Sequence, residues 1–194
     1  MLTITEAFVV DYVYSIVNDF PGGVFTSAIS DRLQALCEAQ IPGDTLQNIG
    51  SDGTSVTLTF ENALSGAEKT ILDGNTSNPA GGLIAKSTEY FDVMDGVNVV
   101  MDGSTLQQQS DGILSTALTL QLRNGNGTPI GGSGQAAIDI DPGNLGPITA
   151  TSGAFGAVNG QFGITVGPTL LRGIVALTVK SGSLPERHVN IEFA

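Results

Sequence analysis

Cysteine is nearly absent from this chain of 194 residues, and tryptophan is absent altogether. The single cysteine, Cys37, excludes an intrachain disulfide, and this usage favours assembly in a reducing compartment. Cys37 lies in the helical pattern Leu33–Ala39, where we expect it to pack as a small hydrophobic residue. A nucleophilic cysteine needs a base nearby, and the only histidine, His188, falls in the other half of the chain.

Positive charge is also scarce, because seven lysines and arginines stand against 19 acidic residues and give a net charge of −12. Seven scattered basic side chains cannot form a long basic patch, so we expect no nucleic-acid partner. The imbalance is confined to residues 1–115, with 15 acids and three bases, whereas residues 116–194 hold four of each. The acidic half either meets a basic partner or only keeps the protein soluble.

No positive charge precedes Arg32, and Glu6, Asp11 and Asp19 interrupt the apolar N-terminal segment. This pattern predicts neither a signal peptide nor a membrane span, and we expect no membrane partner. The chain is only 13% charged and holds 26 glycines, which is typical of a rigid, β-rich protein that works outside the cell. Virion proteins combine such a composition with the lack of an export signal, because they leave the cell by lysis. Type I secretion, or a sequence cut from a longer chain, would give the same pattern.

Motifs of catalysis and metal binding are missing as well. The sequence has no Gly-x-Ser-x-Gly motif, and its glycine-rich run Gly131–Gly134 lacks the lysine of a phosphate loop. Acid pairs occur at Asp92 and Asp95 and at Asp139 and Asp141, but no full set of Ca²⁺ ligands surrounds them. A glycosidase also uses two carboxylates, yet sugar clefts are rich in aromatics, and this chain has only three tyrosines and eight phenylalanines. We expect no catalytic, cofactor or metal site, and a binding protein rather than an enzyme.

The N-terminal segment carries the apolar pattern of an amphipathic helix. A capping box from Thr3 to Glu6 opens a predicted helix over residues 4–19. Four side chains share one face of this helix at a spacing of four: Phe8, Tyr12, Ile16 and Phe20. The many β-branched residues leave a strand open as the alternative. The apolar face packs either in a domain core or against another subunit, and its four residues are the candidate subunit interface of a homo-oligomer.

A helix, a hairpin and a capped helix follow in the rest of the first half. Alternation in Ser55–Phe60 after the turn Ser51–Gly53 indicates the hairpin, and the capping box Ser65–Glu68 indicates the helix start. The predicted elements are a helix over 31–39, strands over 45–49 and 55–60, a helix ending at Leu72, and strands over 83–85 and 90–94. Together they make an α+β domain over residues 1–94.

Strands separated by tight turns fill the second half, residues 95–194. In the clearest strand, residues 114–123, leucines alternate with polar residues, which predicts one wet face. The turn after it, Asn124–Gly127, supplies residues that tolerate positive φ. The predicted strands are 97–101, 114–123, 135–140, 147–152, 160–166, 173–180 and 188–193. A spacing of about ten residues predicts an all-β immunoglobulin-like sandwich over 95–194.

Two motifs resemble known families. Thr57–Phe60 followed by Leu64–Glu68 gives a strand ending in Thr-Phe and then a helix start of the form leucine, small, x, x, acid. The segment around them, residues 33–72, is similar to a small module in structural proteins of tailed bacteriophages. Asn126–Gly132 reads Asn-Gly-Thr-Pro-Ile-Gly-Gly. With this motif, residues 96–194 resemble the bacterial immunoglobulin-like domains of the invasin and intimin type.

These resemblances imply a structural protein on the virion surface of a tailed phage, most simply a capsid decoration or cement protein. A tail or head-fibre component is the nearest alternative, and a fragment of a bacterial surface adhesin is another. The partners implied are other virion proteins, either the major capsid or the tail protein, together with further copies of this chain. The expected mechanism is protein–protein binding without a cofactor.

Overall fold

The chain folds into two units, each with its own core. The structure, a computed structural model, describes residues 9–132, 135–141, 148–149 and 151–194. Unit 1 is formed by residues 1–89 and 124–127, and unit 2 by residues 90–123 and 128–194. The boundary falls before Tyr90 rather than after residue 94, where the sequence analysis placed it. The reason is that Tyr90–Asp95 forms a strand of the sandwich in unit 2.

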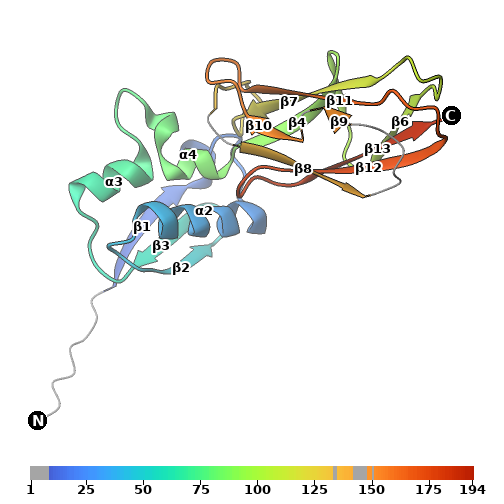
Figure 1. Cartoon of the computed structure of the whole chain (residues 1–194). Helices are drawn as coiled ribbons and strands as arrows, with labels where there is room; N and C mark the ends of the chain where they lie inside the picture. The colour runs from blue at the N-terminus through green and yellow to red at the C-terminus, as the bar shows by residue number, and fades with distance from the viewer. Residues whose placement is uncertain (1–8, 133–134, 142–147, 150) are drawn as a thin grey trace, which may run out of the picture. The chain divides into compact units, whose positions relative to one another are not determined.

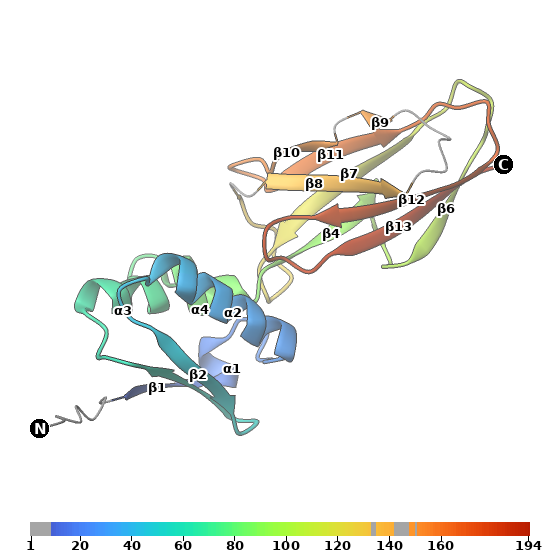
Figure 2. The same cartoon turned by 60° about the horizontal axis from the view of Figure 1, so that its bottom comes forward.

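Unit 1 combines a three-stranded antiparallel sheet with helices. Its strands, in the order β1-β3-β2, are β1 (Val10–Ser15), β2 (Leu46–Ser51) and β3 (Ser55–Phe60). Its helices are α1 (Ile16–Asp19), α2 (Ser27–Gln40), α3 (Gly66–Asp73), α4 (Leu83–Ser87) and the 3₁₀ turn η1 (Pro79–Gly81). Figure 2 shows α2, α3 and α4 on one face of the sheet. Among the described residues, no helix has the length and apolar character needed to cross a membrane.

The core of unit 1 lies between the sheet and these helices. Val56, Leu58 and Phe60 alternate along β3 and are fully buried, together with Leu33 of α2 and Leu72 of α3. Burial of one such side chain contributes about 1.5–3 kcal/mol relative to leaving it in water. The alternation predicted for this hairpin strand is therefore confirmed. Burial of its apolar side chains against the helices holds the helices on the sheet.

The helix predicted over residues 4–19 is wrong where the structure describes it. Residues 10–15 form β1, which pairs with β3 in unbroken register from Val10 opposite Phe60 to Ser15 opposite Ser55. Only Ile16–Asp19 is helical, and residues 4–8 lie outside the described residues. A spacing of four fits the period of a helix and is also a multiple of the period of a strand. The β-branched and aromatic residues of this segment fit the strand, and pairing with β3 decides the outcome.

Other local predictions for unit 1 differ in their outcome. The capping box of α3 is confirmed, because Ser65 Oγ accepts from Glu68 N while the Glu68 carboxylate accepts from Ser65 N at 2.9 Å. α2 begins at Ser27, earlier than predicted, because Thr26 Oγ1 caps it by accepting from Ile29 N. Residues 83–85, predicted as a strand, are the start of α4, whose Leu83 and Ile84 are buried in the core.

Unit 2 is built from two five-stranded sheets that face each other across one core (Figure 1). The first sheet has the order β5-β4-β7-β11-β9, with β4 at Tyr90–Asp95, β5 at Asn98–Val100, β7 at Thr116–Arg123, β9 at Ile148–Thr149 and β11 at Gln161–Val166. The second has the order β10-β8-β12-β13-β6, with β6 at Ser104–Gln108, β8 at Gln135–Asp141, β10 at Ser152–Ala154, β12 at Gly173–Lys180 and β13 at Arg187–Phe193.

The strand order of unit 2 is that of an immunoglobulin-like sandwich. In that fold the sheets contain strands A-B-E-D and C-F-G, with the connections between them crossing from sheet to sheet. Here β4-β7-β11-β9 and β8-β12-β13 take those places in chain order. The short strand β6 adds to the second sheet parallel to β13. The prediction of an immunoglobulin-like sandwich is thus confirmed from the topology alone.

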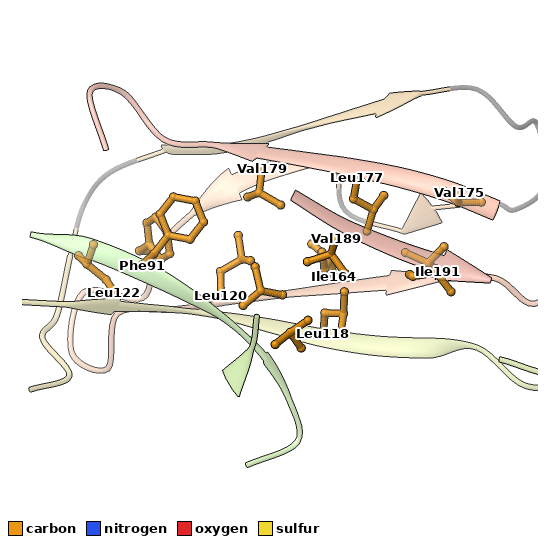
Figure 3. Packing of buried hydrophobic residues seen from close by; sticks show 14 of the residues in the cluster. Phe91, Leu118, Leu120, Leu122, Ile164, Val175, Leu177, Val179, Val189 and Ile191 are labelled. Atoms are coloured by element: carbon orange, nitrogen blue, oxygen red, sulfur yellow. The ribbon is translucent and has the colours of Figure 1, made fainter. Parts of the chain in front are cut away.

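Apolar side chains from both sheets fill the sandwich (Figure 3). Leu118, Leu120 and Leu122 of β7 point inward and meet residues such as Leu177 of β12 and Ile191 of β13. The polar face of β7 departs from the prediction at one point, because Gln121 is only 6% exposed. Its amide nitrogen donates to the carbonyls of Leu122 and Asn159, so the buried group is satisfied.

Candidate binding surfaces

The predicted interface residues do not form a helical face. Phe8 lies outside the described residues. Tyr12 is half-buried on β1, with its ring edge-on to Phe60 at a centroid distance of 5.9 Å. Ile16 and Phe20 are 7% and 1% exposed and belong to the core of unit 1. Of the two roles left open for this segment, the structure places Ile16 and Phe20 in the domain core.

The titratable residues singled out from the sequence are not brought together. Cys37 is buried in unit 1, where burial raises the pKa of its thiol to about 12. His188 lies on β13 of unit 2, with its Nδ1 3.2 Å from Thr178 Oγ1. Asp92 forms an ion pair with Arg123 at 2.5 Å. Among the described residues, no group of three or more acidic, histidine or cysteine side chains is placed to hold a metal ion.

Two loops of unit 2 are joined by hydrogen bonds at one end of the sandwich. One loop, residues 109–115, connects β6 to β7, and the other, residues 167–172, connects β11 to β12. Gly112 N donates to Thr169 O at 3.0 Å, and Thr169 Oγ1 accepts from Leu171 N at 3.0 Å. Thr169 is itself buried, so it fixes both loops from within.

Asp111 holds the first of these loops in shape. One of its carboxylate oxygens accepts from Ile113 N at 2.8 Å and from Leu114 N at 2.9 Å. These backbone hydrogen bonds hold the pKa of the Asp111 carboxyl below its usual range. Gly112 follows with φ of +72°, and a Cβ there would lie 2.8 Å from Leu170 Cδ2. The loop therefore has a fixed conformation that depends on glycine at this position.

Four aliphatic side chains project into solvent from these two loops. We call them the loop patch: Ile113 at 78% exposure, Leu114 at 48%, Leu170 at 76% and Leu171 at 56%. Single exposed aliphatic residues are ordinary, but a cluster on loops held in place by hydrogen bonds is typical of an interaction surface. The loop patch is the candidate binding surface of unit 2.

The loop patch lies at the end of the sandwich remote from Tyr90, where the chain enters unit 2. Tyr90 of β4 pairs with Arg123, the last residue of β7, whereas the loop patch flanks Thr116, the first residue of β7. The last residue, Ala194, is at the same end, because its carbonyl accepts from Ser110 N and Ser110 Oγ. The surface is thus formed by loops and not by a sheet face.

The sequence pattern does not predict this surface. Its signals are the adjacent aliphatic pairs Ile113-Leu114 and Leu170-Leu171, each in a segment with glycine or proline between two strands. Either pair by itself is also what the end of a buried strand looks like. Only the folded topology brings residues more than fifty positions apart to the same end of the sandwich.

Unit 1 contains a pocket of about 400 Å³ beside β1. Its lining comes from β1, α1, the end of α3, η1 and α4: Val13, Tyr14, Asn18, Asp19, Asp73, Pro79, Ile84 and Ala85. The Tyr14 hydroxyl donates to Asp73 Oδ1 at 2.6 Å, and Lys69 Nζ forms an ion pair with the same carboxylate. Burial, followed by the hydrogen bond to Asp73, raises the pKa of Tyr14 above its usual range. Tyr14 is therefore a neutral hydrogen-bond donor in this pocket.

Comparison with known proteins gives distant structural likenesses. No known family matches the sequence. No curated protein matches it. Among solved structures, a Parabacteroides merdae β-glucuronidase aligns at 17% identity and a TM-score of 0.37, over 53% of this chain and only 12% of that enzyme. The D00-D0 domain of intimin aligns at 12% identity and a TM-score of 0.37, over 98% of this chain and 87% of that one. The Yersinia pseudotuberculosis adhesin InvE aligns at 14% identity and a TM-score of 0.39, over 98% of this chain and 49% of that one.

Proposed function

We propose that this chain is a non-enzymatic structural protein on the outside of a tailed-phage particle, which binds a neighbouring virion protein through the loop patch. The observation that carries the proposal is the loop patch itself. Four aliphatic side chains, including Ile113 and Leu170, are held out into solvent by loops that are hydrogen-bonded to each other. A protein gains nothing from such an arrangement in isolation, whereas a partner that covers it removes apolar surface from water.

The energetics of the loop patch suit binding to a preformed site. Each Å² of apolar surface that the partner covers contributes about 25 cal/mol. Less of this gain is lost to ordering, because Asp111 and Thr169 already fix the loops before a partner arrives. The patch is small, so a firm attachment needs copies that are joined to one another and bind several sites of the particle at once.

Electrostatics favour a neutral or basic partner surface. The chain carries a net charge of −12, which repels acidic surfaces and accelerates approach to basic ones. Next to the loop patch, the Asp111 carboxylate is engaged by two backbone amides, and Arg172 adds a positive charge. The patch is therefore apolar at its centre with mixed charge at its rim, as in many protein interfaces.

The assignment to a phage particle rests on residues 33–72. In the structure this segment includes most of α2, the hairpin of β2 and β3, and α3 with its capping box at Ser65 and Glu68. Each element of the resembling phage module is therefore present in the same chain order. We favour the capsid over the tail or head fibre because a small binding surface on loops suits attachment to the repeated sites of a shell.

A bacterial surface adhesin is the second candidate. The observation that favours it is the turn motif Asn126–Gly132, which follows β7 in a sandwich with the strand order of an immunoglobulin-like domain. In that case the loop patch would meet a host receptor or another domain. The two candidates differ in where the protein is found, and not in how unit 2 is built.

Localisation separates these candidates directly. Particles purified by density gradient from the organism that encodes the chain, and the envelope fraction of the host bacterium, would be compared by mass spectrometry. We expect the protein in the particles at many copies each. Recovery in the envelope fraction, with none in particles, would establish the adhesin candidate and overturn the virion assignment.

The role of the loop patch is tested by substitution. We expect the double variant Ile113→Ser and Leu170→Ser to fold normally, because both side chains are exposed, and to lose incorporation into particles. Val158→Ser is the matched control, since Val158 is 94% exposed on a different loop of unit 2. Equal incorporation of both variants would show that the loop patch is not the binding surface.

A further inference from the structure

The pocket of unit 1 is lined by apolar and polar side chains in equal number. The apolar half of the lining is aliphatic: Val13, Pro79, Ile84 and Ala85. The polar half carries a phenol, an amide and two carboxylates: Tyr14, Asn18, Asp19 and Asp73. The volume of about 400 Å³ falls within the roughly 300–1,000 Å³ that small-molecule sites occupy. The pocket therefore has the size and the mixed lining of a site that orients an organic ligand.

The lining residues lie at different depths. Ile84 and Tyr14 are only 3% and 8% exposed, so they form the floor of the pocket. Asn18 and Asp19 of α1 are exposed to solvent and stand at its mouth. A ligand can therefore enter past a carboxylate and place an apolar part against a buried aliphatic side chain.

The titratable groups of the pocket offer hydrogen-bond acceptors rather than donors. Tyr14 donates its only hydroxyl proton to Asp73 Oδ1 at 2.6 Å. Asp19 Oδ2 accepts from Ser15 N at 2.7 Å, and the carboxylate keeps acceptor sites on both oxygens. The Asp73 carboxylate likewise has more lone pairs than its two partners, Tyr14 and Lys69, occupy. A ligand that meets these groups must therefore supply the donors.

The pocket also carries unbalanced negative charge. Lys69 balances Asp73 through an ion pair, whereas Asp19 has no ion-pair partner in the described part of the chain. Burial is the largest cause that raises the pKa of Tyr14, and the charges of Asp73 and Asp19 act in the same direction. Both carboxylates are therefore close enough to act on one point of the pocket.

The other bases of unit 1 do not supply the missing positive charge. Unit 1 holds three bases, and two of them, Arg32 and Lys86, act on Glu89. Neither is among the described residues that line the pocket. The two carboxylates and Lys69 together leave one negative charge, which a ligand with one positive charge would balance.

We propose that this pocket binds an alkyl cation, which is a primary ammonium or guanidinium group on a stem of a few methylene groups. The cationic head donates to the carboxylates of Asp19 and Asp73, and such a head has donors and no acceptor. The stem lies along the aliphatic lining at Val13 and Ile84, as the stems of lysine and arginine lie along apolar surfaces.

Other classes of ligand match the pocket less well. A calcium ion takes about six to eight oxygen ligands, and no group of three or more acidic, histidine or cysteine side chains is placed to hold a metal among the described residues. An anion would meet the charge of Asp19. A neutral apolar molecule would remove the carboxylates from water without a hydrogen bond in return. Only a ligand with both a cationic head and an aliphatic stem uses both halves of the lining.

A titration of the full chain followed by NMR of the backbone amides tests the ligand class. The ligand used is n-butylammonium chloride, and ammonium chloride and 1-butanol are the matched controls for the head alone and the stem alone. We expect saturable shifts at Tyr14, Asp19, Ile84 and Ala85 in the millimolar range, because so small a ligand makes few contacts. Each control should bind at least about fivefold more weakly.

Substitutions test the location of the site. Asp19→Asn should weaken binding roughly three- to fivefold, the effect of one exposed ion pair. Asp31→Asn makes the same change of charge on an exposed acid of α2 and should leave binding unchanged. Ala85→Met fills the pocket and should abolish binding, whereas Ala39→Met adds the same side chain at an exposed position of α2 and should not. Circular dichroism checks that the variants fold.

An alkyl cation can reach the pocket as a free amine or as a side chain of another protein. Binding of acetyl-Gly-Lys-Gly-amide would show that a lysine side chain is accepted, and binding of putrescine without this peptide would restrict the site to free amines. None of these measurements involves the loop patch, so their outcome does not depend on the proposed function. Absence of saturable shifts with n-butylammonium, equal binding of either control, or unchanged binding in both Asp19→Asn and Ala85→Met would overturn the proposal.

Discussion

At the scale of single residues, the ion pair of Arg32 and Glu89 is a costly feature of unit 1. Arg32 Nη2 lies 3.3 Å from Glu89 Oε2, Nη1 donates to the Glu89 carbonyl, and the two side chains are only 8% and 21% exposed. Burial raises the pKa of Glu89 above its usual range, although the guanidinium acts in the opposite direction. A buried pair of this kind adds little net stability to the fold. Removal of one partner, however, leaves the other charge buried and unpaired, which lowers the free energy of unfolding.

Replacement of Arg32 should therefore cost much more than the loss of one ion pair. Arg32→Met keeps most of the side-chain volume and leaves the Glu89 carboxylate in a buried site. We expect urea unfolding at neutral pH to show a loss of about 3–5 kcal/mol in the free energy of unfolding. Lys180→Met is the control, because the Lys180–Glu186 pair is 44% and 50% exposed and such pairs contribute about 1 kcal/mol or less.

The loss in Arg32→Met should also depend on pH. Glu89 holds its proton more tightly in the folded state than in the unfolded state, and removal of the guanidinium increases this difference. The folded state then binds more protons, so stability rises as the pH falls through the raised pKa of Glu89. Repeating the unfolding at pH 5 should recover part of the loss. A deficit that is the same at both pH values would rule out a buried, unpaired carboxylate as its cause.

At the scale of elements, α3 depends on its capping box. Ser65→Ala removes the hydroxyl that accepts from Glu68 N, and we expect it to lower the free energy of unfolding by about 1 kcal/mol. The hydrogen bonds that Ser65 Oγ and Ser65 N donate to the Glu68 carboxylate hold the pKa of that carboxyl below its usual range, so their contribution is present at neutral pH and is lost as the pH falls through that lowered pKa.

The matched control lies inside α2. Thr26 caps this helix, and Ser30 is an interior position. Ser30→Ala should therefore change the free energy of unfolding by less than about 0.5 kcal/mol. Thermal melting of the two alanine variants measures the difference, and equal effects would contradict a specific role for the Ser65 cap.

An element could be predicted from the sequence where the spacing of its apolar residues fitted either the strand period or the helix period, but not both. β3 and β7 alternate without ambiguity, and Ser65 with Glu68 is a local signal, so all three were predictable. β1 was not, because apolar residues at a spacing of four fit a strand as well as a helix until β3 supplies a partner. α4 was not predictable either, since its few residues form a helix only where Leu83 and Ile84 pack into the core.

At the scale of the whole molecule, both units are acidic. Unit 1 holds 11 acids and three bases, and unit 2 holds eight acids and four bases. The neutral sequence half, residues 116–194, is therefore not a structural unit, because strands β4 to β6 and their loops bring four acids into unit 2. The change in charge along the chain therefore does not coincide with the boundary between the units, since the sandwich takes its first strands from the acidic half.

Two separate cores predict two separable stabilities. Leu58 and Leu120 are both fully buried, one in the centre of the unit 1 core and one in that of unit 2. Each substitution, Leu58→Ala or Leu120→Ala, leaves a cavity and should destabilise its own unit by about 2–5 kcal/mol. Local unfolding is governed by the packing of the unit that opens, so faster hydrogen exchange should be confined to the unit that carries the substitution.

Hydrogen exchange read by mass spectrometry distinguishes the two units by their peptides. Leu58→Ala should speed exchange in peptides of β1, β2 and β3 and leave those of β7, β12 and β13 unchanged, and Leu120→Ala should do the reverse. The pair of variants controls for any general effect of a cavity, because the residue removed is the same and only its core differs. If either substitution speeds exchange equally in both sets of peptides, the two units unfold together as one cooperative body. The two cores would then be separate in space but not in stability.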